Sequence, residues 1–351
     1  MRISFVLPPP SLKIAGGYKV VYQYANYCAN NGMEVKIIYD CGKGRNSYKM
    51  PKVLFYQLKK FIARIEPRWF ILNDNIEKLA VYEINNQSVP NADFIVATAC
   101  GTSMKISQLD ETKGKKNYLI QGFENWNRTD QEVIQTYKYD MKKIVISKWL
   151  KEVVDKYSSK SSIYIPNGID KNKFYITKKI EDRYQYSVAM LYHNDKRKRS
   201  DEGLKILLKM KEKYPQLRVE LFGSPKKPSD LPKFVNYTRN ANEKQLHDIY
   251  NNSSIFLVTS SVEGYGLTGI ESMCCGSALV STDCQGVKEY AENGNNALLS
   301  PVDRFDLLEK NLDLLLENNN LRINYARVGS DVINDFNIEA SEEKFLSNLI
   351  N

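Results

Sequence analysis

The sequence predicts an α/β protein of two tandem domains, each built on a parallel sheet. Short apolar runs alternate along the chain with segments of helical periodicity, an alternation typical of βαβ units. The alternation is interrupted at residues 163–170, where a short strand meets a Pro-Asn-Gly turn, and it then restarts. A length of 351 residues also fits two domains, each large enough to bury its own core. We therefore place one Rossmann-like domain at 1–165 and a second at 166–336.

The first domain opens with a predicted βαβ unit. Residues 2–7 form an apolar run that suits a buried parallel strand, and Gly16-Gly17 follows in a turn. Apolar residues then recur at helical spacing from Tyr18, and residues 35–39 predict the second strand. Further strands are predicted at 94–97, 118–121 and 144–147, and helices at 131–137 and 148–156.

The second domain repeats the same alternation. Its predicted strands are 187–192, 218–222, 254–258, 278–282 and 297–300. Its predicted helices are 202–213, 243–250, 267–275 and 287–292, followed by long helices from Asp303 onward. Strands that alternate with helices in this way favour a second parallel sheet rather than a hairpin-based one.

Charge and cysteine content limit the possible partners. The net charge of +9 favours anionic partners such as phosphorylated small molecules, nucleic acid or an anionic membrane surface. None of the six cysteines has metal-binding spacing and two histidines are present, which argues against a structural zinc site. The N-terminus lacks a signal-peptide pattern, and no run of about 18 apolar residues occurs. We expect a cytoplasmic protein with reduced thiols.

The segment 43–70 combines positive charge with apolar side chains. Its residues 43–68 include eight basic residues and one acidic residue, Glu66. One helical face carries Leu54, Leu58, Phe61, Ile62 and Ile65. Such a helix can lie in the plane of an anionic membrane, or it can pack on the sheet with a solvated basic face. A nucleic-acid groove is a third interpretation, but no nucleic-acid-binding module accompanies the segment. We predict a peripheral position on the inner face of the membrane and no nucleic-acid partner.

The strongest chemical signal is a glycine-containing loop between two glutamates. Glu263 and Glu271 flank Gly264-Tyr-Gly266, which follows an apolar strand and leads into a helix. Glycines let backbone N–H groups approach a diphosphate, and the N-terminus of the following helix adds a positive dipole. Glu263 can then hold sugar hydroxyls and Glu271 a ribose diol. The alternative is an ordinary βα turn with a solvated Glu271.

This stretch resembles the family-four glycosyltransferases of the GT-B fold, whose hallmark is two glutamates separated by seven residues. The chain matches with Glu263 through Glu271, with Tyr265 in the aromatic position, and with Ser260 and Gly286-Val-x-Glu289 in context. The resemblance implies that Glu263 contacts the transferred sugar and that Glu271 binds the ribose. The donor-binding residues that it implies in the loop are Gly264, Tyr265, Gly266, Leu267 and Thr268.

A basic loop precedes the first helix of the second domain. The resemblance places a phosphate-binding lysine at Lys198 and, as a departure from the usual arginine, His193 nearby. A neutral histidine is a weaker phosphate ligand than arginine, so Arg197 or Lys196 is expected to compensate. The alternative is a solvated basic loop without a ligand.

In the first domain the resemblance singles out two places. Gly16-Gly17 matches a glycine pair whose backbone approaches the donor phosphates, although a tight βα turn alone would also use it. Gln121 ends a strand where many relatives have a histidine beside the transferred sugar. Glu124 follows as a catalytic or acceptor-binding carboxylate, or as a surface loop residue. The sequence from Gln121 to Trp126 is similar to that of enzymes that make bacterial surface polysaccharides, rhamnosyltransferases among them.

Together these matches imply an enzyme with two Rossmann-like domains that face a central cleft. The acceptor is expected on the first domain and the donor on the second, with a C-terminal helix of about 337–351 packing back on the first. The reaction implied is a retaining transfer of a hexose or deoxyhexose from a UDP-, GDP- or dTDP-sugar to a saccharide or lipid-linked acceptor. Because the chain lacks an Asp-x-Asp motif, no metal is expected. Two alternatives remain: a GT-B nucleotide-sugar epimerase and a non-catalytic nucleotide-sugar-binding subunit.

Overall fold

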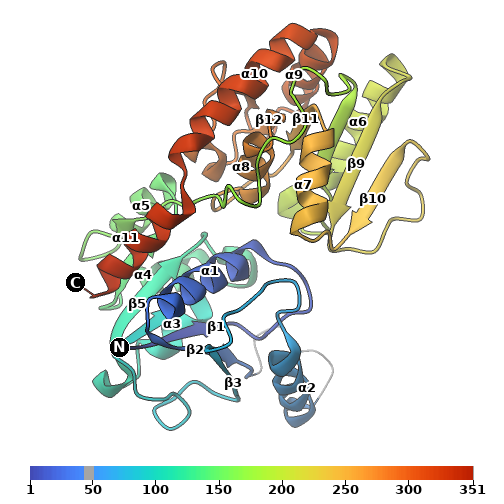
Figure 1. Cartoon of the computed structure of the whole chain (residues 1–351). Helices are drawn as coiled ribbons and strands as arrows, with labels where there is room; N and C mark the ends of the chain where they lie inside the picture. The colour runs from blue at the N-terminus through green and yellow to red at the C-terminus, as the bar shows by residue number, and fades with distance from the viewer. Residues whose placement is uncertain (43–50, 351) are drawn as a thin grey trace. The chain divides into compact units, whose positions relative to one another are not determined.

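A computed structural model describes residues 1–42 and 51–350 of the chain. Internal contacts divide the chain into two compact units (Figure 1). Unit 1 comprises Met1–Pro166 together with Glu339–Asn351, and unit 2 comprises Asn167–Ile338. The chain therefore leaves unit 1 after Pro166 and returns to it after Ile338.

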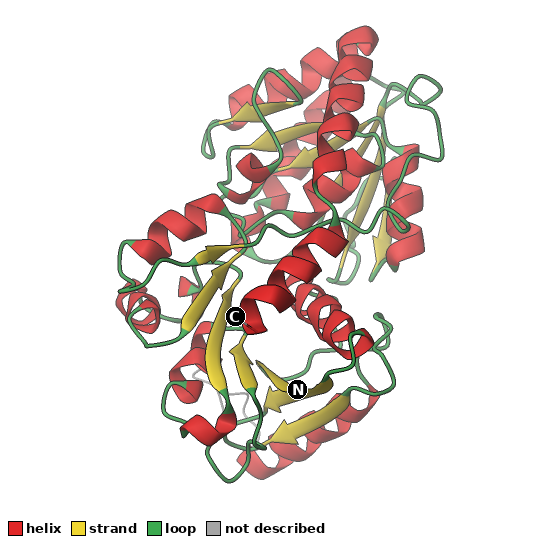
Figure 2. Cartoon of the chain, turned by 60° about the vertical axis from the view of Figure 1, so that its left-hand side comes forward, coloured by secondary structure: helices red, strands yellow, loops and turns green. Residues whose placement is uncertain are grey.

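Unit 1 is a parallel sheet of seven strands with helices along it (Figure 2). The strand order is β3-β2-β1-β4-β5-β6-β7, and β1 pairs in parallel with both β2 and β4. Its strands are β1 (Arg2–Leu7), β2 (Glu34–Asp40), β3 (Glu77–Val81), β4 (Phe94–Ala97), β5 (Lys115–Ile120), β6 (Lys142–Val145) and β7 (Ile163–Tyr164). Its helices are α1 (Gly16–Asn30), α2 (Lys52–Ile65), α3 (Cys100–Ile106), α4 (Asp130–Tyr137), α5 (Lys148–Asp155) and α11 (Ile338–Ile350).

Unit 2 repeats this strand order with six parallel strands, β10-β9-β8-β11-β12-β13. The strands are β8 (Ser187–Leu191), β9 (Arg218–Gly223), β10 (Val235–Arg239), β11 (Ile255–Val258), β12 (Ala278–Thr282) and β13 (Ala297–Ser300). The helices are α6 (Ser200–Lys213), α7 (Glu243–Asn252), α8 (Leu267–Cys274), α9 (Phe305–Glu317) and α10 (Asn319–Val332). The central strands are fully buried, because helices cover both faces of a parallel sheet.

Several predicted elements differ from those observed. Gly16 and Gly17 are the first residues of α1 and not part of the preceding turn. The strand predicted at 144–147 begins two residues earlier, at Lys142. Strands β3 and β10 and the short helix α3 were not predicted. Both missed strands lie at a sheet edge, where they mix polar with apolar residues and most of their side chains are partly exposed.

Helix α11 packs on unit 1 through Phe345. The Phe345 ring stacks on Tyr24 of α1, with ring centroids 4.1 Å apart, and lies 6.0 Å from the ring of Phe5 in β1. Lys142 also donates a hydrogen bond to the carbonyl of Asn348. Because Phe345 is fully buried, this last helix completes the core of unit 1.

Helix α2 packs on β3 and leaves an apolar stripe exposed. Ile62 and Ala63 are buried, whereas the side chains of Leu54, Leu58 and Phe61 are 56%, 44% and 59% exposed. The predicted common face is therefore wrong in part, since Ile62 faces the protein. The N-terminal part of the basic segment, including Lys43, Arg45 and Lys49, lies outside the described residues. No helix in the described ranges is long and apolar enough to cross a bilayer.

Candidate active site

The carboxyl ends of β8 and β11 bring the two predicted motifs of unit 2 together. These strands are neighbours in the sheet but are not consecutive in the chain, so the loops that follow them meet where the strand order reverses. In open α/β sheets, ligands bind in this position. A pocket here is lined by Lys198, Thr259, Ser260, Glu263 and Thr268 together with three apolar residues of β8 and β11. Four of the lining residues come from the two motifs.

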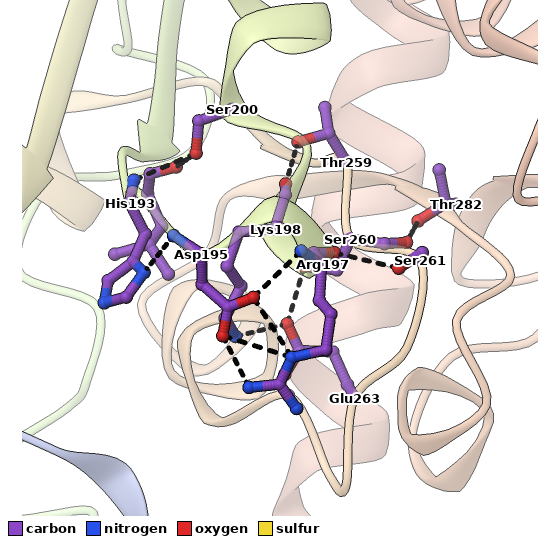
Figure 3. A network of polar contacts seen from close by, with 12 residues as sticks. His193, Asp195, Arg197, Lys198, Ser200, Thr259, Ser260, Ser261, Glu263 and Thr282 are labelled. Atoms are coloured by element: carbon purple, nitrogen blue, oxygen red, sulfur yellow. Dashed lines mark hydrogen bonds and ion pairs between the residues drawn. The ribbon is translucent and has the colours of Figure 1, made fainter. Parts of the chain in front are cut away.

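Lys198 and Glu263 form an ion pair inside this pocket (Figure 3). The Lys198 Nζ lies 2.6 Å from Oε1 of Glu263, and the Ser260 hydroxyl donates to the same oxygen over 2.6 Å. The two charged side chains are only 25% and 13% exposed. Lys198 and Glu263, the two residues predicted as catalytic, thus form an ion pair with each other.

The backbone of the basic loop is fixed by the loop after β11. The Thr259 hydroxyl donates to the carbonyl of Lys198, and the backbone N–H of Ser261 donates to the carbonyl of Arg197, both over 2.7 Å. Lys196–Lys198 form one turn of 3₁₀ helix whose N-cap is Asp195. These contacts hold the backbone of Lys198 while its side chain extends towards Glu263 (Figure 3).

Arg197 is bound by an acid that sequence reasoning did not single out. Its guanidinium forms an ion pair with Asp195 and donates to both oxygens of that carboxylate, with Nε at 3.1 Å from each. These hydrogen bonds are the largest cause that lowers the pKa of Asp195. The expectation that Arg197 compensates for the missing arginine is therefore weakened, because its charge is already shared with Asp195. The sequence signal for this ion pair was Asp195, an acidic residue two positions before Arg197.

His193 is held by the same loop. Its Nδ1 accepts a hydrogen bond from the backbone N–H of Asp195 at 2.9 Å, and its own backbone N–H donates to the Ser200 hydroxyl. Since Nδ1 is an acceptor, the proton of the neutral ring is assigned to Nε2 by this hydrogen bond. His193 in this state offers one N–H donor and no positive charge, unlike the arginine that it replaces.

The loop Glu263–Gly266 is clamped from the side by residues 284–290. The backbone N–H of Glu263 donates to the carbonyl of Cys284, and that of Gly286 donates to the carbonyl of Glu263. A Cβ on Gly286 would lie 2.6 Å from backbone atoms of Gly264 and Tyr265, so the two segments touch through their backbones. Any side chain larger than hydrogen at this position would displace the loop.

Gly266 caps α8 in a left-handed conformation, with a φ of 86° that favours glycine. The Tyr290 hydroxyl donates to the Gly266 carbonyl over 2.7 Å, and the Tyr290 ring packs 5.9 Å from the ring of Tyr265. Tyr265 is buried, so its backbone and not its ring remains for a ligand. Tyr290 fixes the start of α8, where Leu267 and Thr268 are the first two residues, and no sequence motif predicts this role.

Glu271 lies one turn into α8. Its side chain is buried, and its Oε2 accepts a hydrogen bond from the Tyr250 hydroxyl at 3.2 Å. The alternative of a solvated Glu271 is therefore wrong.

The candidate residues of unit 1 also lie at the carboxyl edge of its sheet. The Gln121 side chain donates to the carbonyl of Gly17 over 3.0 Å and so links the end of β5 to the start of α1. Glu124 accepts a hydrogen bond from the backbone N–H of Cys100 at 2.9 Å, at the start of α3. Glu124 is therefore not a solvated loop residue.

Burial raises the pKa of Glu124 to about 7, against the lowering effects of the Cys100 N–H and of Arg128. The titratable side chains that act on or respond to this carboxyl come from several elements: Tyr18, Cys100, Tyr118, Arg128 and Tyr137. A carboxyl with this pKa exchanges its proton near neutral pH.

Comparisons with known proteins agree with this geometry. The family model of glycosyl transferases group 1 matches residues 179–330, within unit 2. The chain is 25% identical to an uncharacterized glycosyltransferase of Haemophilus influenzae, over 94% of this chain and 95% of that protein.

Two further similarities are informative. Over 80 residues the chain is 32% identical to the N,N'-diacetylbacillosaminyl-diphospho-undecaprenol alpha-1,3-N-acetylgalactosaminyltransferase of Campylobacter jejuni, which covers 23% of this chain and 21% of the relative. Among solved structures, Anabaena HepE in complex with UDP-glucose superposes with a TM-score of 0.74 at 14% identity, covering 99% of each chain.

Proposed function

We propose that this chain, which has the GT-B fold and matches the glycosyl transferases group 1 model over residues 179–330, is a retaining glycosyltransferase of cell-surface polysaccharide biosynthesis. It moves a hexose or deoxyhexose from a UDP-, GDP- or dTDP-sugar to a saccharide or lipid-linked acceptor. The observation that carries the proposal is the meeting of Lys198, Glu263 and the start of α8 in one pocket of unit 2.

The donor lies on unit 2 in this proposal. Lys198 and the N-terminus of α8 face the diphosphate, whose charge they complement. The backbone of Gly264, Tyr265 and Gly266 lines the phosphates and sugar, and Glu263 accepts from sugar hydroxyls. The remaining donor contacts proposed are Gly16, Gly17, His193, Arg197, Leu267, Thr268 and Glu271, with Glu271 on the ribose.

Catalysis then depends on stabilising the leaving group. The bond between the anomeric carbon and the β-phosphate oxygen breaks, and a bond to the acceptor hydroxyl oxygen forms on the same face. The acceptor proton passes to the departing diphosphate. Lys198 and the backbone N–H groups of the loop stabilise the charge that develops on that diphosphate. We propose that no metal is required, since cationic and dipolar groups take that role.

The acceptor lies on unit 1, near Gln121 and Glu124. Both residues follow β5, and their side chains reach Gly17 and Cys100, which follow β1 and β4, the two strands between which the order of the sheet reverses and where such sheets usually bind ligands. Carboxylates and amides are suited to the hydroxyls of a sugar. The name of the Campylobacter relative specifies a diphospho-undecaprenol-linked acceptor, which supports a lipid-linked acceptor here.

Helix α2 supports a peripheral position on the cytoplasmic face of a membrane. Leu54, Leu58 and Phe61 form an exposed apolar stripe, and the exposed Lys60 and Arg64 lie on the same helix. An interfacial helix buries such apolar side chains between lipid headgroups while its basic residues contact anionic lipid. A lipid-linked acceptor would be reached from this position.

The test of the enzyme is nucleoside-diphosphate release from a panel of UDP-, GDP- and dTDP-sugars, with and without extracted lipid-linked acceptors. We expect acceptor-dependent release from one donor, and loss of it in Glu271→Ala. Binding of a nucleotide without release from any donor would contradict the transferase and favour a nucleotide-sugar-binding subunit. Donor turnover without acceptor would favour an epimerase.

The membrane proposal has its own test, sedimentation with anionic vesicles. The double substitution Leu58→Ser and Phe61→Ser should reduce vesicle binding by about tenfold or more, because each apolar side chain contributes on the order of 1 kcal/mol when buried in the interface. The matched control is Leu208→Ser with Leu314→Ser, two similarly exposed leucines of unit 2. Equal loss in both double variants would contradict a specific role for α2.

A further inference from the structure

In the pocket of unit 2, the two groups proposed to bind opposite ends of the donor bind each other. Lys198 Nζ and Glu263 Oε1 are 2.6 Å apart, and both side chains are largely buried. An ammonium group in that position cannot be fully available to a diphosphate while a carboxylate holds it. The same carboxylate cannot be fully available to a sugar hydroxyl while the ammonium group holds it.

We infer that Glu263 makes the pocket discriminate between an intact nucleotide sugar and the nucleoside diphosphate left after transfer. The inference rests on the proposed donor function. With a nucleotide sugar bound, sugar hydroxyls occupy Glu263 and Lys198 turns to the diphosphate. After transfer the sugar is gone, Glu263 recaptures Lys198, and the diphosphate loses its cation. Glu263 thus determines specificity for the substrate over the product and favours product release.

The surrounding contacts allow this exchange by rotation of side chains. The Lys198 carbonyl accepts from Thr259, and the Glu263 backbone bonds in both directions to residues 284 and 286. Both backbones are therefore fixed on either side of the pocket. Ser260 donates to Glu263 Oε1 independently of Lys198, so the carboxylate keeps one partner when the lysine leaves. Only the contact between Lys198 Nζ and Glu263 Oε1 has to break, while the Ser260 hydrogen bond to the same oxygen can remain.

The buried position gives the competition its strength. A charge pair at this distance is screened less in a largely buried pocket than at the surface. A diphosphate can regain Lys198 only by displacing a charge-assisted hydrogen bond, which is about twice as strong as a neutral one. Removing the charge of Glu263 should therefore tighten nucleoside-diphosphate binding, whereas loss of an ordinary donor ligand would weaken it or leave it unchanged.

The experiment compares dissociation constants for a nucleoside diphosphate and its sugar form, measured by calorimetry on the full chain. UDP, GDP and dTDP and their sugars are the probes, and the pair that the wild type binds is used. In Glu263→Gln we expect the nucleoside diphosphate to bind on the order of tenfold more tightly, while the nucleotide sugar binds no better than before. The wild-type preference for the sugar form should disappear or reverse.

Two controls keep the result interpretable. Glu309→Gln removes an equal charge from another short ion pair of unit 2, Lys209–Glu309 at 2.9 Å, and should change neither constant. In the wild type, adding the free monosaccharide should tighten nucleoside-diphosphate binding, because the sugar occupies Glu263 and frees Lys198. This second measurement requires no variant.

The outcomes separate the inference from the function. If the wild type binds a nucleotide but Glu263→Gln weakens nucleoside-diphosphate binding or leaves it unchanged, the inference is wrong and the donor site stands. Absence of any effect of the free monosaccharide would also overturn it. If the wild type binds none of the nucleotides or their sugars, the proposed function fails, and the inference fails with it.

Discussion

The two sheets share one strand order, but the carboxylate at the carboxyl edge of each sheet has a different kind of partner. In unit 2, Glu263 is paired with Lys198 across the point where the order reverses. In unit 1, Glu124 at the corresponding edge accepts a backbone N–H, with Arg128 as its nearby cation, and burial raises its pKa to about 7. The frame thus places a carboxylate at each edge, with a lysine as its partner in unit 2 and a backbone N–H as its partner in unit 1.

Lys198→Met is expected to have the largest effect, because it removes the cation that distinguishes the carboxylate of unit 2 from that of unit 1. Glu263 would keep a largely buried carboxylate without its cation, and the diphosphate would lose its proposed ligand. We expect kcat/KM for transfer to fall on the order of 1,000-fold. Lys205→Met, which removes an exposed lysine paired with Glu202 in α6, is the matched control and should lose less than about tenfold. Equal losses in the two variants, measured by steady-state kinetics, would mean that general positive charge and not this pair is required.

A pair of glycine substitutions tests how tightly each edge is built. In Gly286→Ala the new Cβ would lie 2.6 Å from backbone atoms of Gly264 and Tyr265, whereas in Gly17→Ala it would meet the Gln121 side chain at 3.5 Å. We expect Gly286→Ala to cost about 2 to 3 kcal/mol in the free energy of unfolding, and Gly17→Ala less than about 0.5 kcal/mol. Denaturant unfolding measures both values, and similar losses would contradict the different packing of the two loops.

Glu124→Gln tests the carboxylate of unit 1 through the pH dependence of stability. Burial raises its pKa from 4.5 to about 7, so the folded state favours the protonated form and the stability this gives is present below pH 4.5. That contribution is lost as the pH rises through 7. The variant should therefore be more stable than the wild type at pH 8 by about 1 to 2 kcal/mol, with the advantage disappearing towards pH 4.5. Thermal unfolding across this range checks the sign, and a difference that does not vary with pH would rule out the raised pKa.

The smallest expected effect comes from Tyr290→Phe, which keeps the ring beside Tyr265 but removes the hydrogen bond to the Gly266 carbonyl. One such bond contributes about 1 kcal/mol, so donor affinity should fall about fivefold with little change in the fold. Tyr237→Phe is the control, because its hydroxyl also donates to a backbone carbonyl, that of Pro225, outside the pocket. A loss in the control equal to that in Tyr290→Phe would assign the effect to general stability.

The sequence predicted the frame of the molecule well because the central strands are buried on both faces. The run 94–97 is continuously apolar and 278–282 begins with three apolar residues, and both strands appear in the structure with the predicted bounds. The motif from Glu263 to Glu271 was also recognisable, since its glycines and glutamates recur at fixed spacing. The α/β GT-B fold predicted from these signals is confirmed.

The sequence could not predict which side chains would contact one another in the site. Edge strands such as β3 mix polar with apolar residues, since they are less buried than the central strands. The Lys198–Glu263 contact joins residues 65 positions apart, and Tyr290 reaches Gly266 across 24 positions. The binding of Arg197 by Asp195 is local, but it competes with a role for Arg197 that the resemblance favours. Tertiary contacts decided each of these cases.

The return of the chain to unit 1 has a consequence for biosynthesis. During translation, Phe5 and Tyr24 leave the ribosome early, whereas Phe345, which stacks against both, leaves more than 300 residues later. All of the residues of unit 2 are available before then. Unit 2 can therefore complete its core on the ribosome before Phe345 is available to unit 1. A nascent chain in that state lacks Phe345 beside Phe5 and Tyr24, and chaperones bind such incompletely packed chains. A premature stop just before α11 would release a protein with a complete unit 2 and an incomplete unit 1.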